Sequence, residues 1–145
     1  MAERATEQIL INATPAELLS VLLAFERYPD WAADIKDVNV LERDDEGRGT
    51  LVAYRAAAMG QSARYTLAYD YSDIPNSMSW KLTEGSIMRV LDGSYTFEAQ
   101  DVGTLVTYHL EVDLIVPIPG FVKRRAQGKI MGTALRELKK FVESA

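Results

Sequence analysis

Tyrosine is the residue type in this sequence with the clearest chemical potential. Five of the seven tyrosines, Tyr54, Tyr65, Tyr69, Tyr95 and Tyr108, fall in strand-like segments at positions that alternation assigns to inward or nearly inward faces. A buried phenol needs a hydrogen-bond partner, so a group of them predicts an apolar chamber with several hydroxyl tips. Such a chamber suits a flat, mostly apolar molecule with a few oxygen atoms. The alternative is that each is an ordinary core tyrosine bonded to backbone or water.

Two charged residues stand on otherwise apolar strand faces. Alternation places Glu84 beside Trp80 on one segment and Arg89 beside Tyr95 on the next. The short turn between the segments predicts that Glu84 and Arg89 lie opposite each other and form an ion pair. The pair could hold the polar end of a bound molecule or shuttle a proton. The alternative is a weak ion pair at the end of a hairpin, near solvent.

The sequence does not support most of the common types of catalytic site. The chain has no cysteine, and its one histidine, His109, shares an outward face with Thr107 and Glu111. A Ser/His/Asp site or a histidine-rich metal site is therefore not expected. The glycines at 47–49 and 60 belong to hairpin turns and lack the strand-to-helix context of a phosphate-binding loop. We assign no catalytic residue, no metal and no cofactor.

Bulk composition limits the class of partner. The chain has 145 residues, 48% of them hydrophobic, and a formal charge of −5, which predicts one domain spanning residues 1–145. The acidic balance argues against nucleic acid or an anionic membrane as the main partner. Residues 1–15 do not read as a signal peptide, and no apolar run reaches the ~20 residues that span a bilayer. We expect a cytoplasmic monomer or weak dimer without stable membrane insertion.

The elements that must position these residues follow from local patterns. Residues 3–12 predict a strand, and Thr14, Pro15 and Glu17 have the spacing of a helix capping box. A helix of about three turns follows, and Pro29 is expected to bend the chain away from it. Residues 35–116 predict six antiparallel strands separated by turns, including one at 59–61.

Residues 120–143 predict a long C-terminal helix whose apolar stripe turns polar in its first half. The second half carries Ile130 and Met131, whereas the projected stripe meets Lys123 and Gln127 in the first half. We interpret the polar half as facing a chamber mouth or a ligand. The alternative is that the start of the helix projects beyond the sheet.

The order of these elements resembles a known superfamily. With "ATPAELLSVLLAFERYPDW", "GSYTFEAQDVGTLVTYHLEVDL" and "LRELKKFVE", the chain resembles the polyketide cyclase/dehydrase and START-like (SRPBCC) superfamily over nearly its whole length. The resemblance implies an α+β helix-grip fold: a seven-stranded curved antiparallel sheet wrapped around the C-terminal helix, with two short helices between strands 1 and 2. It also implies a cavity between the sheet and that helix.

The resemblance gives the aromatic run near residue 30 a role. Phe25, Tyr28 and Trp31 look like the wall and lid of a ligand chamber, and Pro29 would aim Trp31 inward. The alternative is that they only plug one end of the core. The predicted cavity residues are, in chain order, Trp31, Tyr54, Tyr65, Leu67, Tyr69, Trp80, Arg89, Tyr95, Tyr108, Lys123, Gln127 and Ile130.

Three functions remain open because the superfamily performs several on one scaffold. The first is binding or transport of a small hydrophobic molecule, polyketide-, lipid- or quinone-like. The second is an aromatase/cyclase or dehydratase acting on a polyketide-like substrate, although Arg64, the arginine nearest the matching strand, has outward parity. The third is a protein-binding module similar to ribosome-associating toxins, for which Lys123 and its two arginine neighbours provide a small basic cluster.

Overall fold

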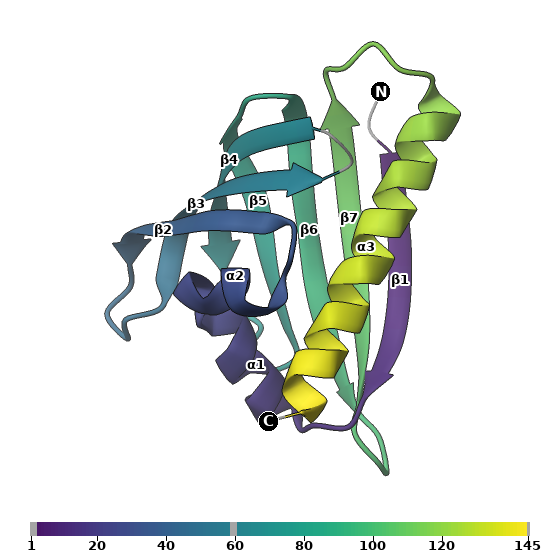
Figure 1. Cartoon of the computed structure of the whole chain (residues 1–145). Helices are drawn as coiled ribbons and strands as arrows, with labels where there is room; N and C mark the ends of the chain where they lie inside the picture. The colour runs from purple at the N-terminus through teal and green to yellow at the C-terminus, as the bar shows by residue number, and fades with distance from the viewer. Residues whose placement is uncertain (1–2, 59–60, 145) are drawn as a thin grey trace.

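The computed structural model describes residues 3–58 and 61–144. Seven strands and a long C-terminal helix form the body of the molecule, and three short helical segments follow the first strand (Figure 1). The elements are, in order, β1 (Glu3–Ile11), α1 (Pro15–Leu23), the 3₁₀ turn η1 (Phe25–Arg27), α2 (Tyr28–Trp31), β2 (Ile35–Arg43), β3 (Gly49–Ala58), β4 (Gln61–Asp70), β5 (Ser77–Gly85), β6 (Met88–Ala99), β7 (Thr104–Leu114) and α3 (Gly120–Glu143).

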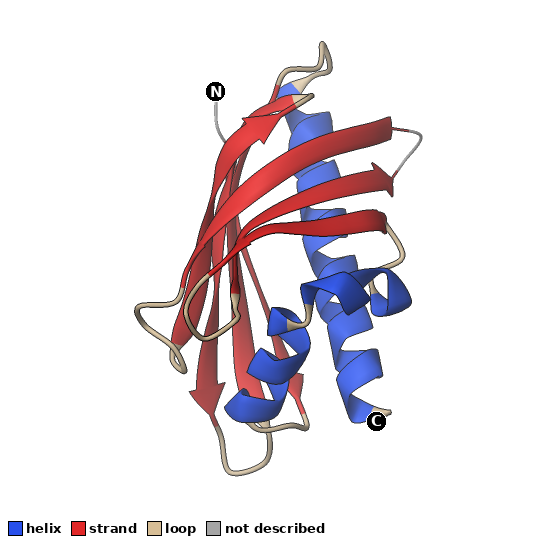
Figure 2. Ribbon diagram, turned by 90° about the vertical axis from the view of Figure 1, so that its left-hand side faces the viewer, coloured by secondary structure: helices blue, strands red, loops and turns tan. Residues whose placement is uncertain are grey.

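The strands form one antiparallel sheet in the order β1-β7-β6-β5-β4-β3-β2. The sheet is strongly curved, α3 runs along its concave side, and α1 and α2 lie beside the lower half of α3 (Figure 2). The predicted helix-grip fold is therefore confirmed. The turn predicted at 59–61 falls mainly on residues 59–60, which lie outside the described residues. No helix within the described part of the chain is long and apolar enough to cross a membrane.

The first helix begins as the sequence predicts. The Thr14 hydroxyl accepts a hydrogen bond from the Glu17 N–H at 3.2 Å, and the Glu17 carboxylate accepts one from the Thr14 N–H at 3.0 Å, which completes the capping box. The helix has nine residues, close to the three turns predicted, and is followed by Ala24, whose φ and ψ of −84° and 67° are not helical. Pro29 does not end this helix; it lies in the first turn of α2, where its missing N–H costs nothing.

Strand alternation sorts the inner face from the outer face. On β7, Val106, Tyr108, Leu110 and Val112 are buried, whereas His109 is exposed. These inner side chains pack against the buried stripe of α3, which comprises Met131, Leu135, Leu138 and Val142. The sheet therefore presents an apolar, tyrosine-rich face to the helix.

Candidate functional site

An internal cavity of about 170 Å³ lies between the inner face of β3–β7, the α2–β2 segment and the middle of α3. Nine of the twelve predicted residues line it: Trp31, Tyr54, Tyr65, Leu67, Tyr69, Trp80, Tyr95, Tyr108 and Ile130. The lining also includes Tyr28, which was expected in the wall or lid of the chamber, and seven residues outside the predicted set: Ala32, Asp34, Ile35, Leu91, Leu110, Ala134 and Glu137. The cavity is therefore built from the strands that alternation identified, together with a loop and a helix face that it did not.

A continuous network of aromatic rings forms the wall. The Trp80 ring lies 5.2 Å from the Tyr95 ring and 5.9 Å from the Tyr108 ring, centroid to centroid. Tyr95 and Tyr108 are themselves 4.7 Å apart, and Tyr69 lies 6.0 Å from Trp80 on the other side. Tilted ring pairs at these separations are favourable, so the wall is held in place by its own packing.

The tyrosine hydroxyls fall into two groups. Tyr28 donates to the Leu22 carbonyl at 2.6 Å, and the Tyr54 and Tyr69 hydroxyls bond to each other at 2.5 Å. The hydroxyls of Tyr65, Tyr95 and Tyr108 make no hydrogen bond to any part of the chain that the structure describes and so remain available at the cavity. Tyr54 and Tyr69 are therefore bonded like ordinary core tyrosines, which agrees with the alternative interpretation. Tyr65, Tyr95 and Tyr108 instead present hydroxyls that have no hydrogen-bond partner among the described residues.

Burial keeps these phenols protonated. Desolvation raises the pKa of Tyr65, Tyr95 and Tyr108, since burial disfavours the phenolate, and neighbouring tyrosines add to the effect. The pKa of Tyr54 and of Tyr69 is raised for the same first reason. At neutral pH all five hydroxyls carry their proton and act as hydrogen-bond donors, not as bases.

Trp31 adds one more donor. Its indole Nε1 is buried and has no hydrogen-bond partner among the residues described. The ring is held by Tyr28, at 5.1 Å between centroids, and by Phe141 of α3, at 6.3 Å. A buried N–H without an acceptor costs about 1–3 kcal/mol of stability. An acceptor atom that bonds to this N–H would remove that cost.

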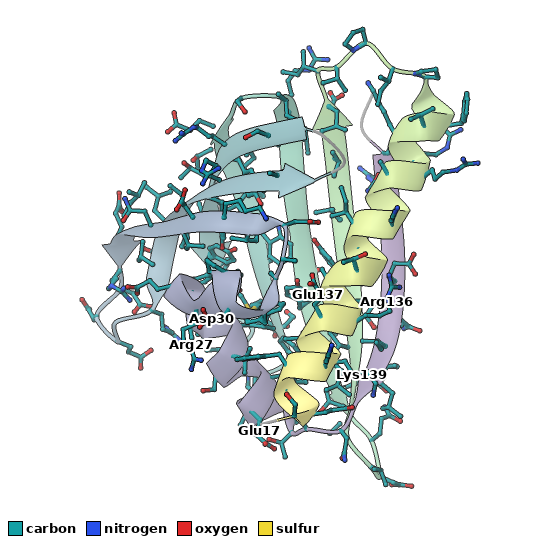
Figure 3. The ribbon with its side chains drawn as sticks, viewed as in Figure 1. Glu17, Arg27, Asp30, Arg136, Glu137 and Lys139 are labelled. Carbon is teal, nitrogen blue, oxygen red and sulfur yellow. The ribbon has the colours of Figure 1, made fainter. Side chains whose placement is uncertain are left out.

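The mouth of the cavity lies between α3 and the link from α2 to β2. Glu137 Oε2 accepts a hydrogen bond from the Ala33 N–H at 3.2 Å and so ties the helix to the link. Figure 3 shows Glu137 on the side of α3 towards that link, whereas Lys139, which donates to the Leu10 carbonyl, lies towards β1. Asp34 and the half-exposed Ile130 complete the mouth. The charged groups of the site are thus at its rim.

The predicted ion pair between Glu84 and Arg89 is wrong. Arg89 Nε instead contacts Asp113 Oδ2 at 3.3 Å, and its side chain is 63% exposed. The cause is a register shift between Met88 and Val90, which reverses the alternation at Arg89.

A second register shift affects the partner of the predicted pair. It lies in the β4–β5 ladder, where Thr83 is the extra residue on β5, and it sets Glu84 opposite Thr66 on the outer face of the sheet. Neither charged group of the predicted pair lines the cavity.

Lys123 and Gln127 also lie away from the cavity. Gln127 is buried, and its amide donates to the Leu110 carbonyl at 3.0 Å and to the Glu3 carbonyl at 3.2 Å. Lys123 Nζ donates to the Leu114 carbonyl at 3.0 Å, at the end of β7. The polar half of the helical stripe therefore faces backbone carbonyls of β1 and β7. It faces neither a ligand nor the mouth.

The described residues bring no three acidic or histidine side chains together in a geometry that could hold a metal ion. The cavity is instead apolar in bulk, with uncommitted donors inside and two carboxylates at the rim. Such an arrangement can bind an uncharged molecule and orient its acceptor atoms.

Comparison with known proteins identifies the family. The profile of the family described as polyketide cyclase / dehydrase and lipid transport matches residues 2–143. A comparison with curated proteins gave no match.

Solved structures show the same fold at low sequence identity. A START superfamily protein from Mycobacterium smegmatis is 22% identical with a TM-score of 0.90, and the match covers 97% of each chain. An aromatase/cyclase from a Streptomyces species is 14% identical with a TM-score of 0.78, and the match covers 99% of this chain and 94% of that one. Major latex-like protein 151 of Panax ginseng is 14% identical with a TM-score of 0.73 and 97% coverage of each chain. These likenesses concern the fold alone.

Proposed function

Because this chain belongs to the polyketide cyclase / dehydrase and lipid transport family, we propose that its cavity binds a small, uncharged aromatic molecule that carries carbonyl oxygens. The observation that carries the proposal is the set of uncommitted donors in an apolar lining. The Tyr65, Tyr95 and Tyr108 hydroxyls and the Trp31 indole N–H have no acceptor among the described residues. A carbonyl oxygen supplies what these donors lack.

The volume of the cavity sets the size of the ligand. A dry apolar cavity of about 150 Å³ accommodates a benzene molecule, whereas drug-sized ligands occupy about 300–1,000 Å³. At about 170 Å³, the cavity suits one or two fused rings without rearrangement. A longer polyketide or lipid chain would need the α2–β2 link to move away from α3, which means breaking the contact between Ala33 and Glu137.

The donors favour an oxygenated ligand over a hydrocarbon of the same shape. Each ligand carbonyl that accepts from a buried hydroxyl gains about 0.5–1.5 kcal/mol, whereas a hydrocarbon leaves that hydroxyl unpaired at a cost of about 1–3 kcal/mol. The aromatic walls contribute the bulk of the affinity through apolar burial, which does not distinguish the two. Selectivity therefore comes from Tyr65, Tyr95, Tyr108 and Trp31.

The same features support binding more than cyclisation. A cyclase needs a base near the reacting carbon, and the buried tyrosines hold their protons because desolvation raises their pKa. Arg89, the arginine that alternation predicted inside the cavity, lies on the outside of the sheet. Asp34 and Glu137 are the carboxylates of the lining, and both lie at the mouth.

The proposal predicts selective binding of naphthoquinone, with naphthalene as the matched hydrocarbon. Both tryptophans line the cavity, so naphthoquinone should quench their emission saturably, and naphthalene should compete only weakly. The chain has no cysteine, so the quinone meets no thiol. Tyr108→Phe removes one donor and should weaken naphthoquinone binding about tenfold while strengthening naphthalene binding, because the hydrocarbon no longer leaves that hydroxyl unpaired. Equal affinity for the two compounds, or no saturable quenching, would contradict the proposal.

A further inference from the structure

The end of the molecule formed by the β7–α3 connection and the first turns of α3 exposes several large apolar side chains. Ile115 is 51% exposed, Ile118 40%, Phe121 61% and Val122 36%. This end, which we call the α3 apex (residues 115–130), projects at the top of the molecule, opposite the turn between β6 and β7 (Figure 1). Single exposed apolar residues are common, but four within eight residues at a projecting end indicate an interaction surface.

Charge is also concentrated at the α3 apex. The α3 apex contains four of the 16 lysines and arginines, namely Lys123, Arg124, Arg125 and Lys129, and none of the 21 aspartates and glutamates. It therefore carries a formal +4 and the rest of the chain −9, which together give the −5 of the whole. The α3 apex is therefore basic, although the protein as a whole is acidic.

The basic residues lie near the N-terminal end of α3, where positive charge is unfavourable for a helix. The N-terminal turn of a helix carries a partial positive charge that favours acidic side chains. The first turn of α3 has no acidic residue, and its N-cap, Pro119, provides no side-chain hydrogen bond. Lys123, at the end of the first turn, therefore costs the helix some stability, and Arg124 and Arg125 follow it in the second turn. A local cost of this kind, beside exposed apolar groups, is typical of a surface kept for function.

Two of these cations have no partner among the residues that the structure describes. Lys123 bonds to the Leu114 carbonyl, and Arg124 contacts Glu3 Oε1 at 3.3 Å. Arg125 and Lys129, both exposed, make no hydrogen bond or ion pair with any residue that the structure describes. They are free to meet an anion outside the molecule.

We propose that the α3 apex docks onto the surface of an anionic lipid bilayer. Phe121 and Ile118 would enter the boundary between headgroups and acyl chains, and Arg125 and Lys129 would contact the acidic headgroups. A bilayer fits better than a protein groove because the apolar side chains stand on a projecting end and the cations flank them. The protein would lie on the membrane and not span it. This inference does not depend on what the cavity binds.

The test is co-sedimentation of the protein with vesicles. Vesicles of an equal mixture of phosphatidylcholine and phosphatidylserine should bind it, whereas vesicles of phosphatidylcholine alone should bind it much more weakly. Each basic side chain near an anionic bilayer contributes about fivefold in affinity, so Arg125→Gln with Lys129→Gln should weaken binding roughly thirtyfold. Phe121→Ser should weaken it about tenfold. High salt should weaken binding of the wild type more than that of the doubly neutralised variant, which keeps only Lys123 and Arg124 at this end.

Matched controls come from the rest of the surface. Val102→Ser removes an apolar side chain that is 68% exposed in the β6–β7 turn, and Lys81→Gln removes a cation on the outer face of β5. Neither should change vesicle binding. Absence of recruitment to the acidic vesicles, or equal losses in the control variants, would overturn the proposal. If the α3 apex bound an acidic protein but did not bind the acidic vesicles, the proposal would be overturned as well.

Discussion

Replacing Ala134 with phenylalanine is expected to abolish binding of naphthoquinone, with an affinity loss of at least about a hundredfold. Ala134 lines the cavity from α3, and the tyrosines of the sheet line it from the strands. A phenyl ring at this position would occupy the space that the ligand needs, and excluding a two-ring ligand removes ~3 kcal/mol or more of apolar burial. Tryptophan quenching measures the affinity, and denaturant unfolding measures whether the fold survives.

The matched control for this variant is Ala126→Phe, about two turns earlier on the same helix and outside the lining. It should bind naphthoquinone as the wild type does. The unfolding free energy of Ala134→Phe should stay within about 1–3 kcal/mol of the wild type, since the new ring enters existing space. An Ala134→Phe protein that folds and binds with unchanged affinity would show that the ligand does not occupy this cavity.

Gly93→Ala is expected to lower the free energy of unfolding by about 3 kcal/mol, at the upper end for overpacked sites. A Cβ on Gly93 would lie 2.5 Å from the His109 carbonyl oxygen and 2.7 Å from Cζ2 of Trp80. The carbonyl belongs to the neighbouring strand, where Gly93 pairs with Leu110, so it cannot move without breaking the ladder. The space that glycine leaves is filled by the Trp80 ring and the backbone of β7.

Gly128→Ala is the control substitution for the Gly93 prediction. A Cβ there would meet only Glu7 Oε1, at 4.0 Å, and alanine is the better helix former. We expect Gly128→Ala to raise the free energy of unfolding by about 0.5–1 kcal/mol. Denaturant unfolding of both variants checks the pair. Equal stability of Gly93→Ala and the wild type would mean that Trp80 does not pack over Gly93 as described.

Strand alternation predicted most of the cavity because the inner face of the sheet is also its wall. Where the ladder is regular, as between β3 and β4 and at Tyr95 and Tyr108, alternate residues point to one side and the assignment follows. Where a register shift interrupts the ladder, alternation reverses, and nothing in the residue types announces this. Arg89 was misplaced for that reason.

Residues outside the strands were harder to place. The helical stripe gave Ile130 correctly, but its polar part, Lys123 and Gln127, bonds to strand backbone that no residue pattern reveals. Asp34 and Glu137 were missed because one lies in a loop and the other on the flank of the stripe. The basic cluster beginning at Lys123 was visible in the sequence, whereas its position at a projecting apolar end required the structure.

The most direct test of the account observes the two indole N–H groups during ligand addition. Trp31 and Trp80 are the only tryptophans and both line the cavity, so ¹⁵N-labelled protein should give two side-chain indole signals. If naphthoquinone occupies the cavity, both signals should shift saturably, and the Trp31 signal should move downfield as its unpartnered N–H gains an acceptor. Two signals that stay in place under excess naphthoquinone would contradict the account.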